Sequence, residues 1–106
     1  MVKIYHKLVR DKIPQIIEAG GNTCTTQILS QESYLKMLDE KLTEELNEYL
    51  ESKSPEELAD LLEVMKALTA AKGSSWDALE AIRAEKEERR GGFREKILLE
   101  EVTEKD

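Results

Sequence analysis

Cysteine is almost absent from this sequence, since Cys24 is the single one among 106 residues. A lone cysteine cannot form an internal disulfide bond, and scarce cysteine is typical of proteins that work in a reducing cytosol. We also find no signal peptide and no apolar run of membrane-spanning length. We therefore expect a cytoplasmic protein that does not interact with membranes.

Several common catalytic motifs are missing as well. The chain has no zinc-ligand spacing, no serine nucleophile elbow and no glycine-rich phosphate loop of the P-loop type. Its net charge of −7 is concentrated in residues 31–65, which carry eleven acidic and three basic side chains. This acidic middle disfavours nucleic-acid binding. Basic segments on both sides of it suit a metal site whose flanks hold an anionic ligand.

Hydrophobic periodicity predicts two helices joined by a tight turn within residues 41–65. Apolar side chains recur there at steps of three and four residues, namely Leu42, Leu46, Tyr49 and Leu50, then Leu58, Leu61, Leu62 and Met65. Between the two groups, Ser54 is a typical N-cap, Pro55 suits the first helical turn, and Glu57 stands at the acid position of a capping box. One helix should therefore end near Ser52 and the next should begin at Pro55.

The N-terminal third contains weaker signals. Asp11 can cap a short helix that runs through Ile17 and ends at Gly20. Residues 22–29 are rich in threonine and other β-branched side chains, so we expect an extended segment there. Ser30 can then cap the long helix that forms the first arm of the hairpin.

The C-terminal third is predicted to hold one more helix. The second arm of the hairpin should continue to Lys72, and Ser74 or Ser75 can cap the helix that follows. That helix should end at Gly91-Gly92. Residues 93–102 carry a run of apolar side chains, for which we expect a short strand or a packed tail.

Together these elements predict an all-α fold. We expect residues 1–106 to form a single domain, a helical bundle built on an antiparallel helix hairpin with short extended N- and C-terminal segments. Charged residues make up 37% and hydrophobic residues 40% of the chain, which suits a narrow helical core. We expect Trp76 and Phe93 to belong to that core. Because long hairpins bury little surface by themselves, self-association is also expected.

Four acidic residues are placed to meet across the predicted hairpin. They are Glu45 and Glu48 in the first arm and Glu57 and Asp60 in the second. At about 100° per residue, each pair lies to the same side of its own apolar stripe, and the pairs are symmetric about the turn. Clustered carboxylates repel one another unless a cation offsets their charge. Because Mg²⁺ and Mn²⁺ prefer such oxygens, the pattern predicts a divalent-metal site. The alternative is an ordinary acid-rich surface on which Glu57 serves as a cap.

Two groups of basic residues flank these acids. The first, near the N-terminus, is Lys7, Arg10 and Lys12. Taken alone, this group indicates an ordinary solvent-exposed segment. The second surrounds Gly91-Gly92 and includes Lys86, Arg90 and Arg94. Adjacent glycines allow close approach of a ligand, and arginines can grip phosphate oxygens. A plain helix stop is the alternative for this second group.

Three motifs of the sequence resemble those of a known family. The order KL-x-EE-x-x-E and then ELAD, within residues 41–60, is similar to the MazG-like all-α nucleoside triphosphate pyrophosphohydrolases. The opening YHKLVRDKIP, residues 5–14, resembles more specifically a phosphoribosyl-ATP pyrophosphohydrolase-like branch. The ending RGGF, residues 90–93, followed by ILLEEV, is similar to the same branch. The gap between the two acidic motifs is shorter than in many relatives.

The resemblance implies an enzyme that cleaves between the α and β phosphates of a nucleotide and releases a nucleoside monophosphate and pyrophosphate. It implies that the four acids bind Mg²⁺, or Mn²⁺, and that Glu44 positions or deprotonates the attacking water. The substrate contacts that it implies are Lys7, Arg10, Lys12, Lys86, Arg90 and Arg94. It also implies a homodimer or homotetramer.

Three functions therefore remain open. The first is house-cleaning hydrolysis of modified or damaged nucleoside triphosphates, and the second is a non-enzymatic helical module whose acidic face binds a basic partner. The third is hydrolysis of phosphoribosyl-ATP in histidine biosynthesis, which the branch label indicates. The sequence alone does not distinguish the substrate.

Overall fold

The computed structural model describes residues 1–105, and within that range all regular secondary structure is helical. Its elements are α1 (Ile13–Ala19), α2 (Gln31–Ser52), α3 (Pro55–Ala71) and α4 (Trp76–Arg90). No strand occurs in the described residues. The prediction of an all-α fold is thereby confirmed. The chain divides into two compact units, Met1–Ser74 and a second that begins at Ser75, and each is described by itself.

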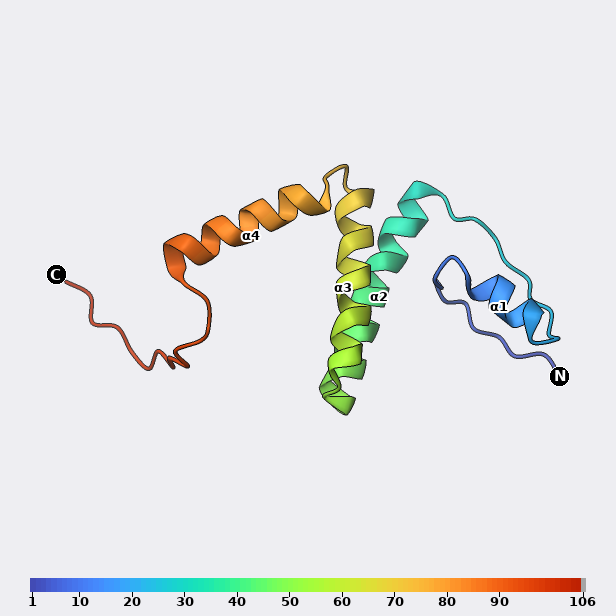
Figure 1. Ribbon diagram of the computed structural model, residues 1–106, viewed down its shortest axis with the longest axis horizontal. Coiled ribbons are helices and arrows are strands. Elements are labelled where there is room, and N and C mark those ends of the chain that lie inside the picture. Colours follow the sequence, from blue (N-terminus) through green and yellow to red (C-terminus); the bar gives the residue numbers. More distant parts are fainter. Residues whose placement is uncertain (106) are drawn as a thin grey trace. The chain divides into compact units, whose positions relative to one another are not determined.

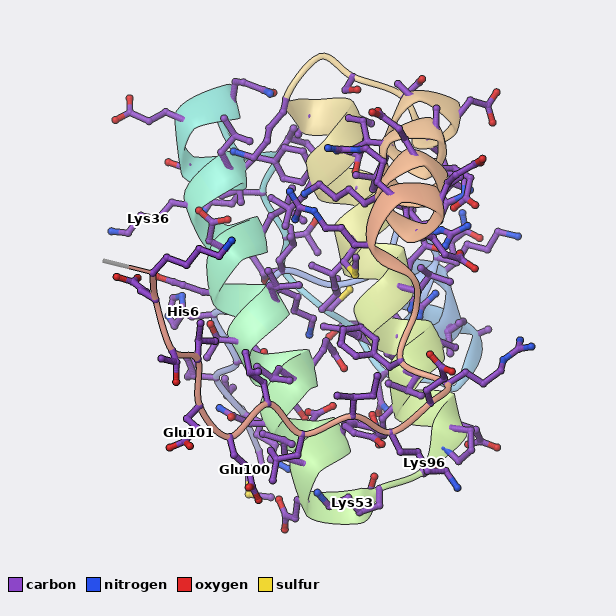
Figure 2. The ribbon with its side chains drawn as sticks, turned by 90° about the vertical axis from the view of Figure 1, so that its left-hand side faces the viewer. His6, Lys36, Lys53, Lys96, Glu100 and Glu101 are labelled. Carbon is purple, nitrogen blue, oxygen red and sulfur yellow. The ribbon has the colours of Figure 1, made fainter. Side chains whose placement is uncertain are left out.

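Helices α2 and α3 pack against each other as an antiparallel hairpin (Figure 1). The Ser30 hydroxyl accepts a hydrogen bond from the Ser33 backbone N–H and caps α2. At the other end Lys53 adopts a left-handed conformation, with φ of 60°, and forms the turn (Figure 2). The Ser54 hydroxyl then accepts from the Glu56 N–H and caps α3. The predicted hairpin, with its end at Ser52 and its restart at Pro55, is confirmed.

The predicted capping box at the start of α3 does not form. In a capping box the Glu57 side chain would accept the Ser54 backbone N–H. That N–H instead donates to the Ser52 hydroxyl at 3.2 Å. The Glu57 carboxylate keeps an oxygen that is buried and without a hydrogen-bond partner. Glu57 therefore does not complete a capping box, and one of its oxygens lies within 4.8 Å of oxygens of Glu45 and Asp60.

The hydrophobic core of the first unit is small. Its buried side chains are Leu38, Val64 and Leu68, and the partly buried Leu8, Tyr34, Leu42, Ala67 and Ala71 pack against them. Burial of one such aliphatic side chain contributes roughly 1.5–3 kcal/mol. Apolar residues nearer the turn are 39–50% exposed, namely Leu46, Leu50, Leu58, Leu62 and Met65. Two helices alone cover a single strip of each other, so much of the predicted stripe stays uncovered.

The N-terminal segment contains one correction. Helix α1 begins at Ile13, and its N-cap is Lys12, which makes no side-chain capping hydrogen bond. Asp11 lies in the turn before this position, one residue too early to cap the helix. The capping role predicted for Asp11 was therefore wrong. Residues 22–29, predicted to be extended, have no regular secondary structure.

The second unit consists of α4 and the segment that follows it. The Ser75 hydroxyl accepts the Ala78 N–H and caps α4, as one of the two predicted alternatives required. Within the helix, Arg83 forms ion pairs with Glu80 and Glu87, both at 2.6 Å. Helix α4 ends before Gly91, which has a φ of 81° and confirms the predicted stop.

The prediction of a strand or packed tail in residues 93–102 was wrong. Phe93 is 99% exposed, and the other large apolar side chains of the segment, Ile97, Leu98, Leu99 and Val102, are 70–80% exposed. A strand needs a neighbouring strand for its ladder, and none exists among residues 1–105. Phe93 is accordingly not a core residue, whereas Trp76 is half-buried.

None of the helices among the described residues is long and apolar enough to span a membrane.

Candidate metal centre

Glu45 is the most buried acid of the hairpin. Only 7% of its surface is exposed, and it is one of the two buried residues of α2. One oxygen each of Glu45, Glu57 and Asp60 lies within 4.8 Å of the other two. The Oε2 atoms of Glu45 and Glu57 are buried and have no hydrogen-bond partner. Burial of an unpaired carboxylate oxygen is costly, so these oxygens are candidates for metal ligation.

A second trio of carboxylates shares Glu45. Oxygens of Glu44, Glu45 and Glu48 also lie within 4.8 Å of one another, and all three side chains come from α2. Three of the four acids predicted to ligate a metal, Glu45, Glu57 and Asp60, share one trio, whereas the exposed Glu48 is grouped with Glu44 and Glu45 of its own helix. Two oxygens bound to one Mg²⁺ are at most about 4.2 Å apart. The oxygens of each trio are therefore at most slightly farther apart than two oxygens bound to one Mg²⁺.

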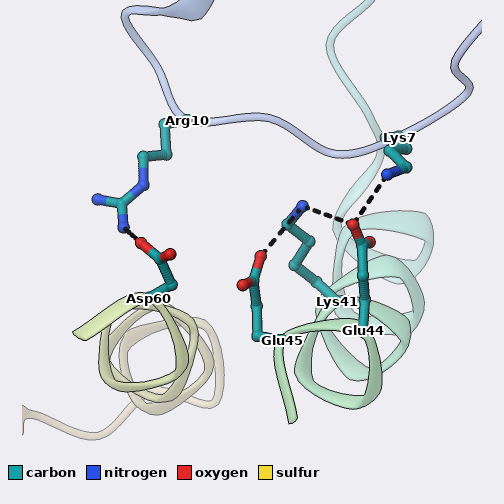
Figure 3. A network of polar contacts seen from close by, with 6 residues as sticks. All are labelled: Lys7, Arg10, Lys41, Glu44, Glu45 and Asp60. Atoms are coloured by element: carbon teal, nitrogen blue, oxygen red, sulfur yellow. Dashed lines mark hydrogen bonds and ion pairs between the residues drawn. The ribbon is translucent and has the colours of Figure 1, made fainter. Parts of the chain in front are cut away.

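Two of the predicted substrate contacts lie against these acids. The segment before α1 crosses the hairpin, where Lys7 Nζ lies 2.9 Å from Glu44 Oε1 and an Arg10 guanidinium nitrogen 2.7 Å from Asp60 Oδ1 (Figure 3). Lys12 is exposed at the start of α1. The basic residues near the N-terminus are thus more than a solvated segment, because Lys7 and Arg10 place positive charge beside the carboxylates.

The other predicted substrate contacts belong to the second unit. Lys86 and Arg90 lie on α4, and Arg94 follows it. Arg90 and Arg94 line an open hollow around Gly91 and Gly92. Their role in phosphate binding stays a prediction.

Lys41 is a member of the cluster that the sequence patterns did not single out. Its Nζ lies 3.5 Å from Glu44 Oε1 and 3.4 Å from Glu45 Oε1, between the two side chains (Figure 3). Its side chain is only 22% exposed. The i, i+3 and i, i+4 spacing to these acids was the signal that would have identified it.

The electrostatics of the two adjacent glutamates differ. Burial of the Glu45 carboxyl, together with the neighbouring Glu48 carboxylate, raises the pKa of Glu45 above its ordinary value. The hydrogen bond from Lys7 lowers the pKa of Glu44, and the same contact raises the pKa of Lys7. Glu44 is therefore ionised at neutral pH and is a weak base. It is better suited to accept a hydrogen bond from water than to remove its proton.

The residues present fit a hard divalent cation. The donor atoms are all carboxylate oxygens, which Mg²⁺ and Mn²⁺ prefer. Glu45 and Glu57 each keep a buried oxygen without a hydrogen-bond partner, which a cation at this position could satisfy. A nearby cation would offset both the repulsion and the burial cost.

Comparisons with known proteins identify little beyond this geometry. No family model matches the chain, and no solved structure matches it. An uncharacterized protein from Mycolicibacterium smegmatis is 48% identical to the chain over 42 residues. The match covers 40% of this chain and 43% of that relative. The name of this relative indicates no activity.

Proposed function

We propose that this protein is a Mg²⁺-dependent nucleoside triphosphate pyrophosphohydrolase. It would cleave the bond between the α and β phosphates and release a nucleoside monophosphate and pyrophosphate. House-cleaning of modified or damaged nucleotides in the cytoplasm is the role we favour. The finer fold assignment, a MazG-like bundle of the phosphoribosyl-ATP pyrophosphohydrolase-like branch, is part of the same proposal.

The observation that carries this proposal is the buried Glu45 carboxylate. One of its oxygens is buried without a hydrogen-bond partner, and the carboxylate lies with Glu57 and Asp60 in a group of donors suited to a divalent cation. A cation bound there supplies charge neutralisation of the phosphate oxygens. An acid cluster without one would repel a triphosphate, which carries the same sign of charge.

The remaining residues of the cluster have roles that follow from their charge. Glu44 is ionised and 29% exposed, so it can accept a hydrogen bond from water and orient it toward the α phosphate. Lys7 and Arg10 are more than half exposed and stand on a segment outside the hairpin. Their ion pairs with acids hold them beside the site, where they can contact phosphate oxygens.

The uncovered apolar face of the hairpin supports a homo-oligomer. Five large apolar side chains near the turn are 39–50% exposed, although they follow helical spacing. In sedimentation velocity, we expect the wild-type protein to sediment as a dimer or tetramer. Replacing Leu62 with Glu should shift it toward the monomer, whereas replacing the exposed polar Asn47 with Glu should not. A wild-type monomer at all micromolar concentrations would contradict the assembly.

The activity is tested by a pyrophosphate-release screen. Standard and modified nucleoside triphosphates are incubated with the protein and Mg²⁺ or Mn²⁺, and both products are identified. We expect equal amounts of monophosphate and pyrophosphate, with no release after treatment with a chelator. Release of orthophosphate and diphosphate would contradict cleavage between α and β.

The alternatives give different results in the same screen. With phosphoribosyl-ATP added to the substrates, a phosphoribosyl-ATP pyrophosphohydrolase would act on this compound and leave the nucleoside triphosphates intact. An acidic interaction module would release pyrophosphate from none of them and would show no stoichiometric metal binding.

A further inference from the structure

The two oxygens of the Glu45 carboxylate have different surroundings. Oε1 lies 3.4 Å from the ammonium group of Lys41. Oε2 is buried and has no hydrogen-bond partner. The same side chain belongs to the trio with Glu57 and Asp60 and to the trio with Glu44 and Glu48. Glu45 therefore stands between two potential cation positions, and one of them already has a positive group beside it.

We propose that the Lys41 ammonium is a built-in cation that occupies the second of these positions, so that the site takes one divalent ion and not two. The ion would be held by Glu45, Glu57 and Asp60, and Lys41 would balance the charge of Glu44 and Glu45. This inference rests on the proposed metal site and adds its stoichiometry.

Position and burial support a fixed role for Lys41. It lies on α2 one turn before Glu44 and Glu45, and its Nζ is within 3.5 Å of both. With 22% of its side chain exposed, Lys41 is more enclosed than Lys7, at 51%, and Arg10, at 57%. The outer two can move to a substrate, whereas Lys41 is confined between the carboxylates by its own helix.

The charge balance of the cluster points the same way. Two carboxylate trios that share Glu45 contain five acids, and three basic side chains pair with them. With all of these ionised, two negative charges remain uncompensated, which is the charge of one divalent cation. A second divalent ion would give the group a net positive charge and would lie beside the Lys41 ammonium, which repels it. Removing the Lys41 charge removes this repulsion and leaves three uncompensated negative charges for divalent ions to neutralise.

The test is the stoichiometry of Mn²⁺ binding to the metal-free protein. Isothermal titration and electron paramagnetic resonance are applied to the wild type, Lys41→Met and Lys41→Gln. We expect one ion per chain in the wild type. In both variants we expect a second ion per chain and magnetic coupling between neighbouring Mn²⁺ ions. Lys41→Arg keeps the charge and should restore one ion per chain.

Lys36→Met is the matched control. Lys36 is exposed on the same helix, and its side chain points away from the hairpin (Figure 2). This variant should bind one ion, as the wild type does. Circular dichroism establishes that each variant is folded before it is titrated.

Two results would overturn the role of Lys41 while leaving the metal site in place. One is a wild type that binds two ions, and the other is folded Lys41→Met and Lys41→Gln proteins that still bind one. No saturable binding by the wild type would overturn the proposed function itself, and the stoichiometry with it. The two failures are thus distinguishable in one titration series.

Discussion

Replacing Asp60 with Asn should lower the turnover of pyrophosphate release by about a thousandfold. Asp60 supplies one oxygen of the trio with Glu45 and Glu57, and its replacement removes a charged candidate ligand from that group. A bound cation contributes several kcal/mol to charge stabilisation during phosphoryl transfer, and each 1.36 kcal/mol corresponds to about tenfold in rate.

The fold should survive this change, which makes the loss interpretable. The Asp60 ion pair with Arg10 is 2.7 Å long, but its side chains are 42% and 57% exposed. Such pairs contribute about 0–1 kcal/mol to stability, so the helical circular dichroism should be unchanged. Glu63→Gln, an exposed acid on the same helix, is the control and should keep full activity. Full activity in Asp60→Asn would eliminate the metal site formed with Glu45 and Glu57.

Glu45→Gln is expected to have opposite effects on stability and on metal binding. The amide fills the same space without a buried negative charge, and we expect the cost of the unpartnered oxygen to exceed the value of the 3.4 Å contact with Lys41, so the metal-free variant should be more stable than the wild type by about 1 kcal/mol. For a chain of this length, that raises Tm by roughly 4–8 °C. Mn²⁺ should raise the Tm of the wild type and leave that of the variant unchanged. Thermal unfolding with and without Mn²⁺ measures both effects.

The pH dependence of this difference follows from the direction of the Glu45 shift. Burial raises the pKa of Glu45 in the folded state, so the folded protein holds this proton more tightly than the unfolded chain does. The metal-free wild type therefore loses stability relative to the variant as pH rises through that window, from the unfolded pKa to the raised one. The advantage of Gln should be full at neutral pH and vanish in acid. A variant that is less stable at neutral pH would contradict a costly buried carboxylate.

The helices were predictable because their signals are local. Capping serines such as Ser30 and Ser54, the turn at Lys53 and the stop at Gly91 each depend on a few neighbouring residues. Two predictions in the terminal segments were wrong. Asp11 stands one residue too early to cap α1, and the apolar residues after Gly92 find no neighbouring strand within the described chain.

The candidate site was predictable in outline and not in detail. Helical angles and symmetry about the turn placed Glu45, Glu57 and Asp60 together, because both depend on spacing alone. The partners of these acids were not predictable from spacing. The Ser54 N–H donates to the Ser52 hydroxyl and not to Glu57. The contact of Lys7 with Glu44 depends on a segment without regular secondary structure. The stripe near the turn stayed exposed because two helices cannot enclose it.

The most direct measurement is anomalous diffraction from crystals of the protein grown with Mn²⁺. We expect an anomalous-difference peak between α2 and α3, with carboxylate oxygens of Glu45, Glu57 and Asp60 within about 2.3 Å of it. Density without a peak at this position, or these three side chains pointing into solvent on separate surfaces, would contradict it.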